Sequence, residues 1–459
     1  MISPSPLIFA AAAAAVFALA PLRIAILAVY LGGLMLLPIA EYGQPFPERF
    51  PWWIVGPALP SEGLVAKTWI AALAALAGAA IRDPRALAGF RPGLADLPMA
   101  AWCLWPLAAG LWIGGASPGP VVASLLVTGC WGAPWLLGRV WFATPADRAL
   151  LVQGLALSAL VCLPVAVAEG LQGPFLHDLI YGPHPFRFDG DERYLGFRPI
   201  GFFLHGNLYG IWAAAAAVAA AWSAAALRGA WRGALAALAL GIALASQSVG
   251  ALLLMAAALA LLAAWGRRWV LPLLGIGVGV AALLLALHLS GAAPVQRIAR
   301  NTALGQAVLD AFRSVGRASF LWRISQDLKA MAVFEGDPLV GVSAWDWWRA
   351  AGTRPWGLVM LMAGQYGLIA VALVFGGLGA AAGAALVRLR RARAWRPEAA
   401  ALPLAAIVLM GLGDAVLNAF FLFPAVLAAG AVAAGARTPV ATPAAAPSAT
   451  PAATPAAGD

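Results

Sequence analysis

The side chains of this chain that could do chemistry are concentrated in two polar stretches, residues 169–202 and 290–355. The second stretch carries eight basic residues against five acidic ones. The planar arginine fork makes paired, charge-assisted hydrogen bonds to phosphate. The arginines of both stretches are therefore candidates for binding an anionic ligand, namely Arg187, Arg193, Arg198, Arg317, Arg323, Arg349 and Arg354.

A positively charged loop need not bind anything, because the bias of positive charge toward the cytoplasm holds only for loops below about 60 residues. Within residues 314–333, however, apolar side chains recur at helical spacing, at Phe320, Leu321, Ile324, Leu328 and Met331. Arg317, Arg323 and Asp327 fall away from the centre of this stripe. The pattern predicts an amphipathic helix at the membrane interface. Its basic residues either face a ligand or are merely solvated.

The end of the first stretch brings polar side chains to the start of an apolar run. Arg198 is followed by Pro-Ile-Gly-Phe-Phe-Leu and then by His205-Gly-Asn207. Polar residues at membrane depth are costly and mark a site by default. The alternative is that His205 and Asn207 only bond neighbouring helices. The spacing of His177, His184 and the nearby carboxylates matches no zinc pattern, so no metal or other cofactor is expected.

The composition decides which elements must position these residues. Of the 459 residues, 63% are hydrophobic and only 10% are charged, whereas a soluble domain carries about 25% charged residues. The apolar residues form runs of about 20, which is one bilayer thickness. This excludes a soluble enzyme, a disordered protein, a disulfide scaffold and an outer-membrane barrel with short alternating strands. We therefore expect an all-α, polytopic integral membrane bundle.

Thirteen apolar runs predict about 12–13 transmembrane helices, at residues 6–20, 22–40, 64–81, 97–116, 119–142, 148–168, 203–226, 233–247, 249–265, 269–289, 356–386, 398–412 and 415–435. Every second connection is short and arginine-bearing, which assigns it to the cytoplasm. The long connections 41–63, 169–202 and 290–355 then share the opposite face. The net charge of +10 partly reflects this asymmetry, and no nucleic-acid partner is expected.

The chain divides into alternating membrane and loop regions. We expect N-terminal transmembrane helices in 1–168, a loop in 169–202, core helices in 203–289, a large loop in 290–355, C-terminal helices in 356–436 and a disordered tail in 437–459. The tail consists of Ala/Pro/Thr repeats that cannot bury a core.

Four short motifs occur in a fixed order along the second half of the chain. They are Arg198-Pro-Ile-Gly201-Phe-Phe-Leu-His205-Gly-Asn207, the turn Ser246-Gln-Ser-Val-Gly250, Arg323 followed by Asp337-Pro-Leu-Val-Gly341, and Gln365-Tyr-Gly367-Leu-Ile. Together they resemble the O-antigen ligase and O-antigen polymerase family of bacterial glycosyltransferases. Gln247 stands where that family has an arginine. The resemblance covers roughly residues 195–430.

The resemblance implies a GT-C-like bundle in the bacterial inner membrane, with two functional loops facing the periplasm. It implies metal-independent transfer from a polyprenyl-diphosphate-linked glycan to a glycan, lipid or protein acceptor. By the same resemblance Arg198, Arg323 and His205 are the catalytic candidates. The expected substrate-binding residues are Arg187, Arg193, Asn207, Arg317, Arg349, Arg354 and Asp337.

One departure from the family pattern affects the expected mechanism. Ligases of the family carry a histidine followed by asparagine after the large loop, and this chain has Trp356-Gly357 there. The candidate bases that are left are His205, Asp337 and Glu335, and a polysaccharide polymerase is favoured over a ligase. The alternatives from another class are a lipid-linked glycan flippase and a non-catalytic assembly subunit. A flippase should show internal repeats and broken helices, and the two halves of the sequence show no convincing repeat.

Overall fold

The computed structural model describes residues 5–40, 52–59, 65–114, 119–227, 229–292, 295–314, 319–331, 336–393 and 397–434. Arg317, Glu335 and the tail 437–459 lie outside these ranges. Within them the regular secondary structure is helical, apart from one hairpin of two-residue strands, β1 (Glu192–Arg193) and β2 (Gly196–Phe197), and two isolated β-bridges. The expectation of an all-α bundle is confirmed.

Each of the thirteen apolar runs contains a helix. The first six runs hold α1 (Ser5–Leu19), α2 (Leu22–Leu36), α4 (Lys67–Arg82), α6 (Leu97–Trp112), the pair α7 (Gly119–Val127) and α8 (Ala133–Trp141), and α9 (Pro145–Gln172). The next four hold α11 (Gly206–Ala226), α12 (Ala230–Ala245), α13 (Val249–Ala264) and α14 (Val270–Leu289). The last three hold α18 (Leu358–Val371) with α19 (Gly377–Arg391), α20 (Ala401–Asp414) and α21 (Pro424–Ala433).

The lengths of these helices indicate a multi-pass membrane protein. Six helical segments of the described chain are long and apolar enough to cross a bilayer, and six further apolar helices are shorter. A span needs roughly 20 apolar residues. The run 415–435 differs most from expectation, because its helix begins only at Pro424. Residues 415–423 instead form a non-helical segment.

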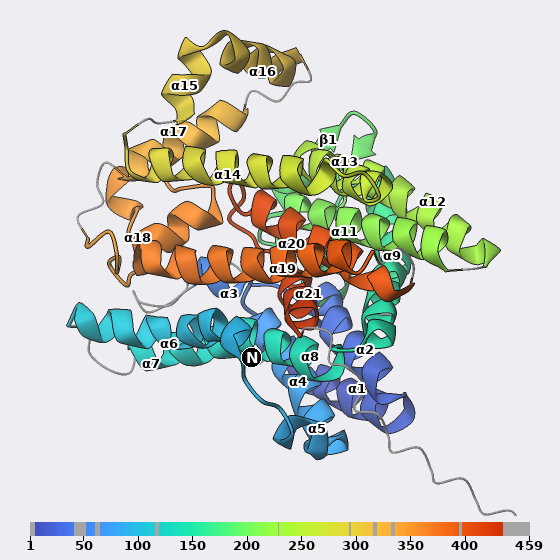
Figure 1. Cartoon of the computed structure of the whole chain (residues 1–459). Helices are drawn as coiled ribbons and strands as arrows, with labels where there is room; N and C mark the ends of the chain where they lie inside the picture. Colours follow the sequence, from blue (N-terminus) through green and yellow to red (C-terminus); the bar gives the residue numbers. More distant parts are fainter. Residues whose placement is uncertain are drawn as a thin grey trace, which may run out of the picture.

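The central helix of the bundle is α11, which packs against α9, α12, α13 and α20. Its side of contact is rich in alanine, including the buried run Ala213–Ala217, and small side chains let membrane helices approach closely. On the other side α8 packs against α21, where a Cβ on Gly138 or Gly430 would collide with the backbone of the facing helix. Figure 1 shows this arrangement, with α11 beside α20.

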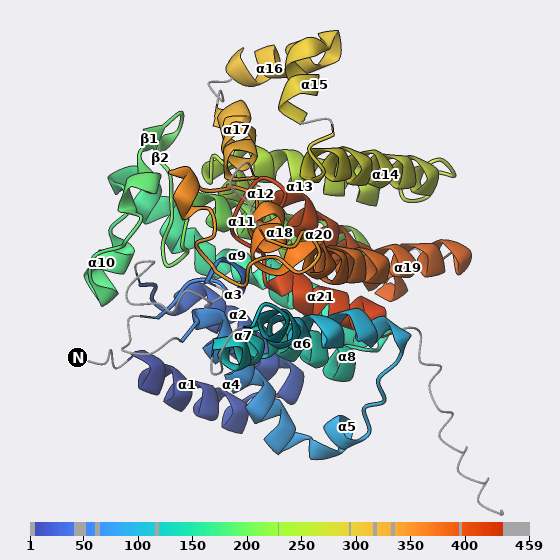
Figure 2. The same ribbon diagram turned by 90° about the vertical axis from the view of Figure 1, so that its left-hand side faces the viewer.

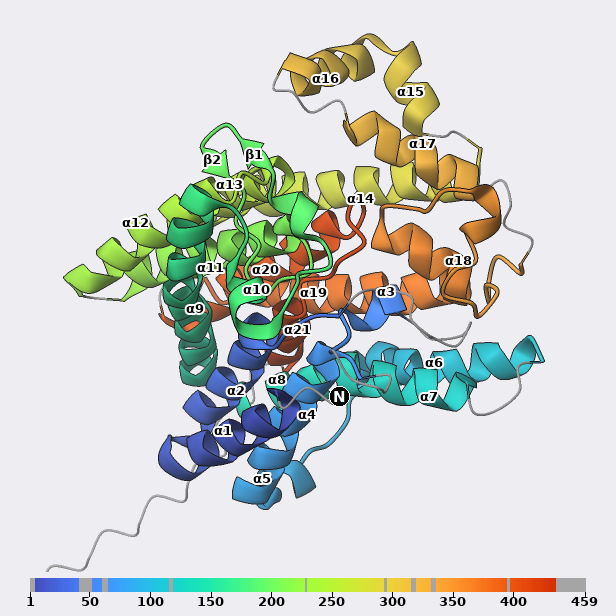
Figure 3. The ribbon, with the colours of Figure 1, turned by 180° about the vertical axis from the view of Figure 1, so that it is seen from behind.

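The large loop carries three helices, α15 (Val295–Asn301), α16 (Ala303–Ser314) and α17 (Ser319–Met331). Figures 2 and 3 show α15 and α16 standing away from the bundle, with α17 between them and the bundle. The first loop contains α10 (Leu176–Tyr181) and the β1–β2 hairpin, and α3 (Trp52–Val55) and α5 (Pro84–Ala88) complete the short helices. In all three views the hairpin and α15–α17 lie on the same, upper side of the molecule.

The helix α18 is interrupted at Gly367, whose φ of 74° lies in the left-handed region. The backbone groups freed by this break pair with the segment Pro338–Ser343. Leu368 N–H donates to Pro338 O (2.9 Å), and Ser343 N–H donates to Gln365 O (2.7 Å). Glycine is required here, because a Cβ would collide with the Leu339 carbonyl. Two of the motifs that carry the family resemblance therefore pack directly on each other.

Candidate functional site

The candidate site is a cavity of about 260 Å³ between α13, the end of α20 and the two arginine-bearing loops. It is lined by Arg193, Asn207, Gln247, Ser248, Val249, Gly250, Leu253, Leu254, Phe312, Arg323, Gly413, Asp414, Leu417 and Asn418. One wall is apolar and is formed by α13, Phe312 and Leu417. The other wall is polar and carries two arginines against one carboxylate. The cavity thus suits a ligand with an apolar chain and an anionic head.

Part of the polar wall is a hydrogen-bond network centred on two asparagines. Asn207, at the start of α11, donates from Nδ2 to Oδ1 of Asn418 (2.9 Å). Arg323 donates to the same Oδ1 (2.7 Å), and Asn418 donates from Nδ2 to Asp414 Oδ1 (2.6 Å). Ser248 donates to Asn207 Oδ1 (3.3 Å). The network fixes side chains from four separate elements relative to one another.

Arg198 lies behind this wall and not in the cavity. Only 2% of the residue is exposed. Its guanidinium donates to Asn207 Oδ1 and pairs with Asp189 (3.4 Å). Burial raises the pKa of Asp189, and the positive charge of Arg198 partly offsets this rise. In this position Arg198 orients Asn207 and does not reach a ligand in the cavity.

His205 is the N-cap of α11. Its Nδ1 accepts the Asn207 N–H (3.0 Å) and lies 3.0 Å from Asp189 Oδ2. Burial lowers the pKa of His205 well below its ordinary value, and the charges of Arg198, Arg323, Arg354 and Arg193 act in the same direction. The imidazole is therefore neutral. Nδ1 thus lies between a donor, the Asn207 N–H, and the carboxylate of Asp189, and His205 is not among the residues that line the cavity.

These charge effects also show that four of the arginines predicted from the sequence converge. Arg193 and Arg323 line the cavity, Arg198 lies behind it, and Arg354 is close enough to act on His205. Arg354 is sandwiched against the rings of Trp356 (4.3 Å) and Trp53 (4.6 Å). The two loops are far apart in sequence, so this convergence is a product of the fold.

The helix α17 is tied to the start of α18 by polar contacts near Arg323. Asp327 Oδ1 accepts the N–H of Trp356 (2.9 Å), and Gln326 accepts the hydroxyl of Thr353. The Trp356 ring lies 5.2 Å from the Arg323 guanidinium. Burial raises the pKa of Asp327 to about 7. Trp356 thus acts as a packing surface for the arginines.

Three of the expected substrate-binding residues are engaged elsewhere. Arg187 pairs with Asp178 (3.0 Å), and its side chain is 66% exposed. Arg349 pairs with Asp346 (2.9 Å). Asp337 accepts the N–H of Leu339 (2.7 Å) within its own turn. Arg317 lies outside the described residues.

Sequence analysis missed the residue that anchors the first loop, Glu169 at the end of α9. The side chain is 1% exposed and accepts four backbone N–H groups, from Phe175, Leu176, Ile200 and Gly201. Its carboxylate therefore ties both ends of the loop together. A lone acidic residue at the end of a long apolar run was the available signal.

Gln247, in the turn between α12 and α13, holds the hairpin of the same loop. Its Oε1 accepts the Leu195 N–H (3.1 Å), and its Nε2 donates to Gly196 O (3.3 Å). An amide can make both kinds of bond, which an arginine cannot. Gln247 therefore couples the turn between α12 and α13 to the hairpin.

The two histidines of the first loop are structural. His184 accepts the Phe186 N–H at Nδ1 (3.0 Å), and its Nε2 lies 3.0 Å from Phe203 O. His177 accepts the Ile39 N–H at Nε2 (3.2 Å). Among the described residues no group of three His, Cys, Asp or Glu side chains is placed to hold a metal ion.

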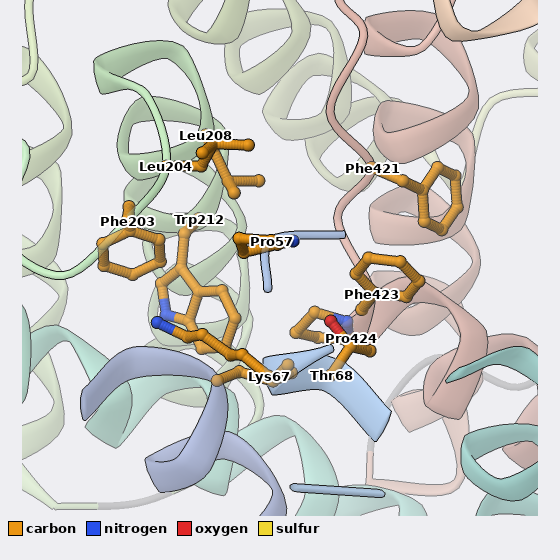
Figure 4. Close-up of a pocket in the computed structure, with 11 residues that line it drawn as sticks. Pro57, Lys67, Thr68, Phe203, Leu204, Leu208, Trp212, Phe421, Phe423 and Pro424 are labelled. Carbon is orange, nitrogen blue, oxygen red and sulfur yellow. The ribbon is translucent and has the colours of Figure 1, made fainter. Parts of the chain in front are cut away.

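A second, smaller pocket of about 30 Å³ lies beneath the loop and contains Lys67. Figure 4 shows the lysine among apolar side chains, extending toward Phe203 and Trp212. Its Nζ donates to the carbonyls of Leu37 (2.7 Å) and Phe202 (2.7 Å). The pocket has room for about one water molecule, so we assign Lys67 a structural role.

No protein-family model, no curated protein and no solved structure matches this chain.

Proposed function

We propose that the chain is an integral-membrane glycosyltransferase that uses a polyprenyl-diphosphate-linked glycan as donor. The observation that carries the proposal is the convergence of Arg193 and Arg323, from two separate loops, on one half-apolar cavity. A diphosphate fits the arginines, and an isoprenoid chain fits the wall formed by α13. The inference that the donor carries a glycan rests on the motifs that resemble the O-antigen ligase and polymerase family.

The proposed reaction is a single displacement at the anomeric carbon of the donor sugar. The acceptor hydroxyl oxygen forms the new bond to that carbon. The bond from the carbon to the diphosphate oxygen breaks, and the polyprenyl diphosphate leaves with the electron pair. Fixed arginines stabilise the charge that develops on the leaving group without reorganisation. The hydroxyl proton needs an acceptor.

We assign the proton acceptor to Asp414. It is the carboxylate among the cavity-lining residues, and Asn418 donates a hydrogen bond to its Oδ1, which leaves Oδ2 for a hydroxyl. Among the earlier candidates, His205 is held by the cap of α11 and by Asp189, and it does not line the cavity. Asp337 is engaged in its own turn, and Glu335 lies outside the described residues.

The finer features of the proposal are a bundle of about 12–13 spans of the GT-C kind in a bacterial inner membrane, with the cavity facing the periplasm. A polysaccharide polymerase is the preferred activity, because Trp356 replaces the histidine of the ligases. A ligase that transfers the glycan to a lipid or protein acceptor is the runner-up.

The flippase alternative has one observation in its favour, the break in α18 at Gly367. Broken helices at the bilayer midplane form the ion and substrate sites of many transporters. Here, however, carbonyls and N–H groups at the break pair with Pro338–Ser343, and Tyr366 O accepts the indole N–H of Trp105 (2.7 Å). The break thus anchors the large loop, and we retain the glycosyltransferase as the proposed function.

The test uses the full chain in nanodiscs with native polyprenyl-diphosphate glycan, and products are read by mass spectrometry. A ladder of repeats indicates a polymerase, and a single product that requires added lipid or protein acceptor indicates a ligase. Arg323→Ala should lower the rate by about 10²–10³, and Arg323→Lys should also be slow because a point charge lacks the paired geometry. Binding of the carrier without turnover would favour the flippase or an assembly subunit.

A further inference from the structure

The strand β1 separates the cavity described above from a second hollow. Glu192 and Arg193 are adjacent, and successive residues of a strand point to opposite faces. Arg193 lines the arginine-bearing cavity, whereas Glu192 lines a groove of about 430 Å³ on the other side. The two hollows therefore share one thin wall.

The groove differs from the cavity in its chemistry. Its hydrogen-bonding side chains are Gln172, Arg187, Asp191 and Glu192, and its aromatic side chains are Phe188 and Phe197. Two carboxylates outweigh the one arginine, whose guanidinium is already paired with Asp178. A diphosphate would be repelled here, while the cavity across the wall attracts one.

The lining of the groove fits a saccharide. Carboxylates and an amide bind sugar hydroxyls as acceptors and donors. Phe188 is 68% exposed, so its ring offers a flat apolar face against which the C–H face of a sugar ring can lie. A volume of several hundred Å³ with mixed polar and apolar lining is typical of a small-molecule site.

The position of the groove relative to the cavity is fixed by buried contacts. Asp189, two residues before Asp191, accepts the Gly206 N–H and pairs with Arg198 behind the cavity. Gln247 holds the other end of the hairpin through Leu195. A site supported by buried partners holds its ligand in a constant relation to the reacting centre.

We propose that this groove binds the acceptor saccharide and presents it across the hairpin to the donor in the cavity. The inference rests on the proposed glycosyltransferase function and adds to it a second, separate substrate site. It predicts that recognition of the acceptor depends on its sugar units and on side chains that never touch the diphosphate.

The experiment compares three forms of the full chain in nanodiscs. They are the wild type, the double variant Asp191→Asn/Glu192→Gln, and the control Asp310→Asn, which changes an exposed carboxylate on α16. The probe is a phosphate-free oligosaccharide of the host's polysaccharide repeat. Its binding is measured by saturation-transfer NMR, and polyprenyl diphosphate binding is measured separately. The double variant should weaken oligosaccharide binding by at least about tenfold and leave carrier binding unchanged.

The outcomes separate this inference from the proposed function. If the double variant binds the oligosaccharide more weakly and the control does not, the groove is supported as the saccharide site. This holds even if the wild type shows no glycan transfer, and in that case only the proposed enzyme activity fails. Unchanged binding, equal losses in Asp310→Asn, or no oligosaccharide binding to the wild type overturns the groove. If the wild type transfers glycan, the double variant should raise the acceptor KM at constant kcat. Phe188→Ala should act in the same way.

Discussion

The arginines of the site divide into residues that face the cavity and residues that hold it in shape. Arg323 and Arg193 belong to the first group. Arg198 belongs to the second, because its guanidinium is buried between Asp189 and Asn207. The two groups should respond differently to substitution, although the family resemblance had made Arg198 and Arg323 catalytic candidates together.

We predict that Arg198→Ala destabilises the protein. The change leaves the buried carboxylate of Asp189 without its counter-ion, which costs about 3–5 kcal/mol in comparable buried pairs. The apparent thermal midpoint in detergent should fall, and the double variant Arg198→Ala/Asp189→Asn should recover part of the loss. An unchanged midpoint together with lost transfer would mean that Arg198 contacts substrate after all.

His184 should make stability depend on pH. Burial lowers the pKa of His184 from 6.5 to about 4, and the contact of its Nε2 with Phe203 O acts in the opposite direction. Between these two pH values the unfolded chain binds more protons, so stability falls as pH drops from about 6.5 to 4 and is fully present above that window. The shift corresponds to at most about 3 kcal/mol.

The measurement for this prediction is the thermal midpoint of wild type and His184→Gln between pH 4 and 8. The variant cannot titrate at this position, so its midpoint should fall less than that of the wild type below pH 6.5. Parallel curves would assign the acid sensitivity to other groups. His177 lies beside His184, with ring centroids 5.0 Å apart, and His177→Gln is the matched comparison.

At the scale of elements, the position of Arg323 depends on how α17 is attached. Asp327 and Gln326 bind the segment Thr353–Trp356, and this attachment places Arg323 against Asn418. Because the pKa of Asp327 is raised to about 7 from 3.8, the folded state binds more protons than the unfolded state between these values. Asp327 therefore destabilises the attachment as pH rises from about 4 to 7.

We predict opposite effects for two substitutions of Asp327. Asp327→Asn keeps the Oδ1 acceptor for Trp356 N–H and removes the charge, so α17 should stay attached and lose its pH dependence. Asp327→Ala removes the acceptor for the Trp356 N–H, so α17 should detach from the start of α18. Hydrogen-exchange protection factors for residues 319–331, measured at pH 5 and pH 8, distinguish the two. If Asn and Ala abolish transfer equally while protection is unchanged, Asp327 takes part in the reaction itself.

The elements themselves were largely predictable, because a span must be apolar over its length and the sequence records this directly. All thirteen runs contain a helix, and residues Ser246–Ser248 form the predicted turn. The segment 415–423 was not predictable in this way. Apart from Asn418 its residues are apolar like those of the helices. The segment is nevertheless non-helical, and within it the Asn418 carbonyl accepts the Leu358 N–H (3.0 Å) while its side chain joins the polar network.

The site was predictable only in part. Arg198, His205 and Asn207 are adjacent to a membrane run, and Arg323 lies on an amphipathic helix, so local patterns pointed to them. Asp189 lies in the same loop as Arg198, whereas Ser248 and Asn418 come from two other segments that only tertiary packing brings to the site. The same holds for the groove, which depends on which face of a two-residue strand each side chain occupies.

At the scale of the whole molecule, the proposal requires residues 169–202 and 290–355 to lie on one face of the membrane. Both loops contribute to one cavity, and the alternation of basic connections assigns them to the same side. The native cysteines Cys103, Cys130 and Cys162 are buried, so they should not react with a membrane-impermeant maleimide. Introduced cysteines can therefore report the topology.

We predict that Phe188→Cys and Leu304→Cys, both at well-exposed positions, are labelled from the periplasm in intact spheroplasts. Trp269→Cys, beside the basic pair Arg267 and Arg268, should be labelled only after the membrane is permeabilised. The wild type is the control for background labelling. Labelling of the two loop positions from opposite sides would separate Arg193 from Arg323 by the bilayer, and the shared cavity could then not exist in the membrane.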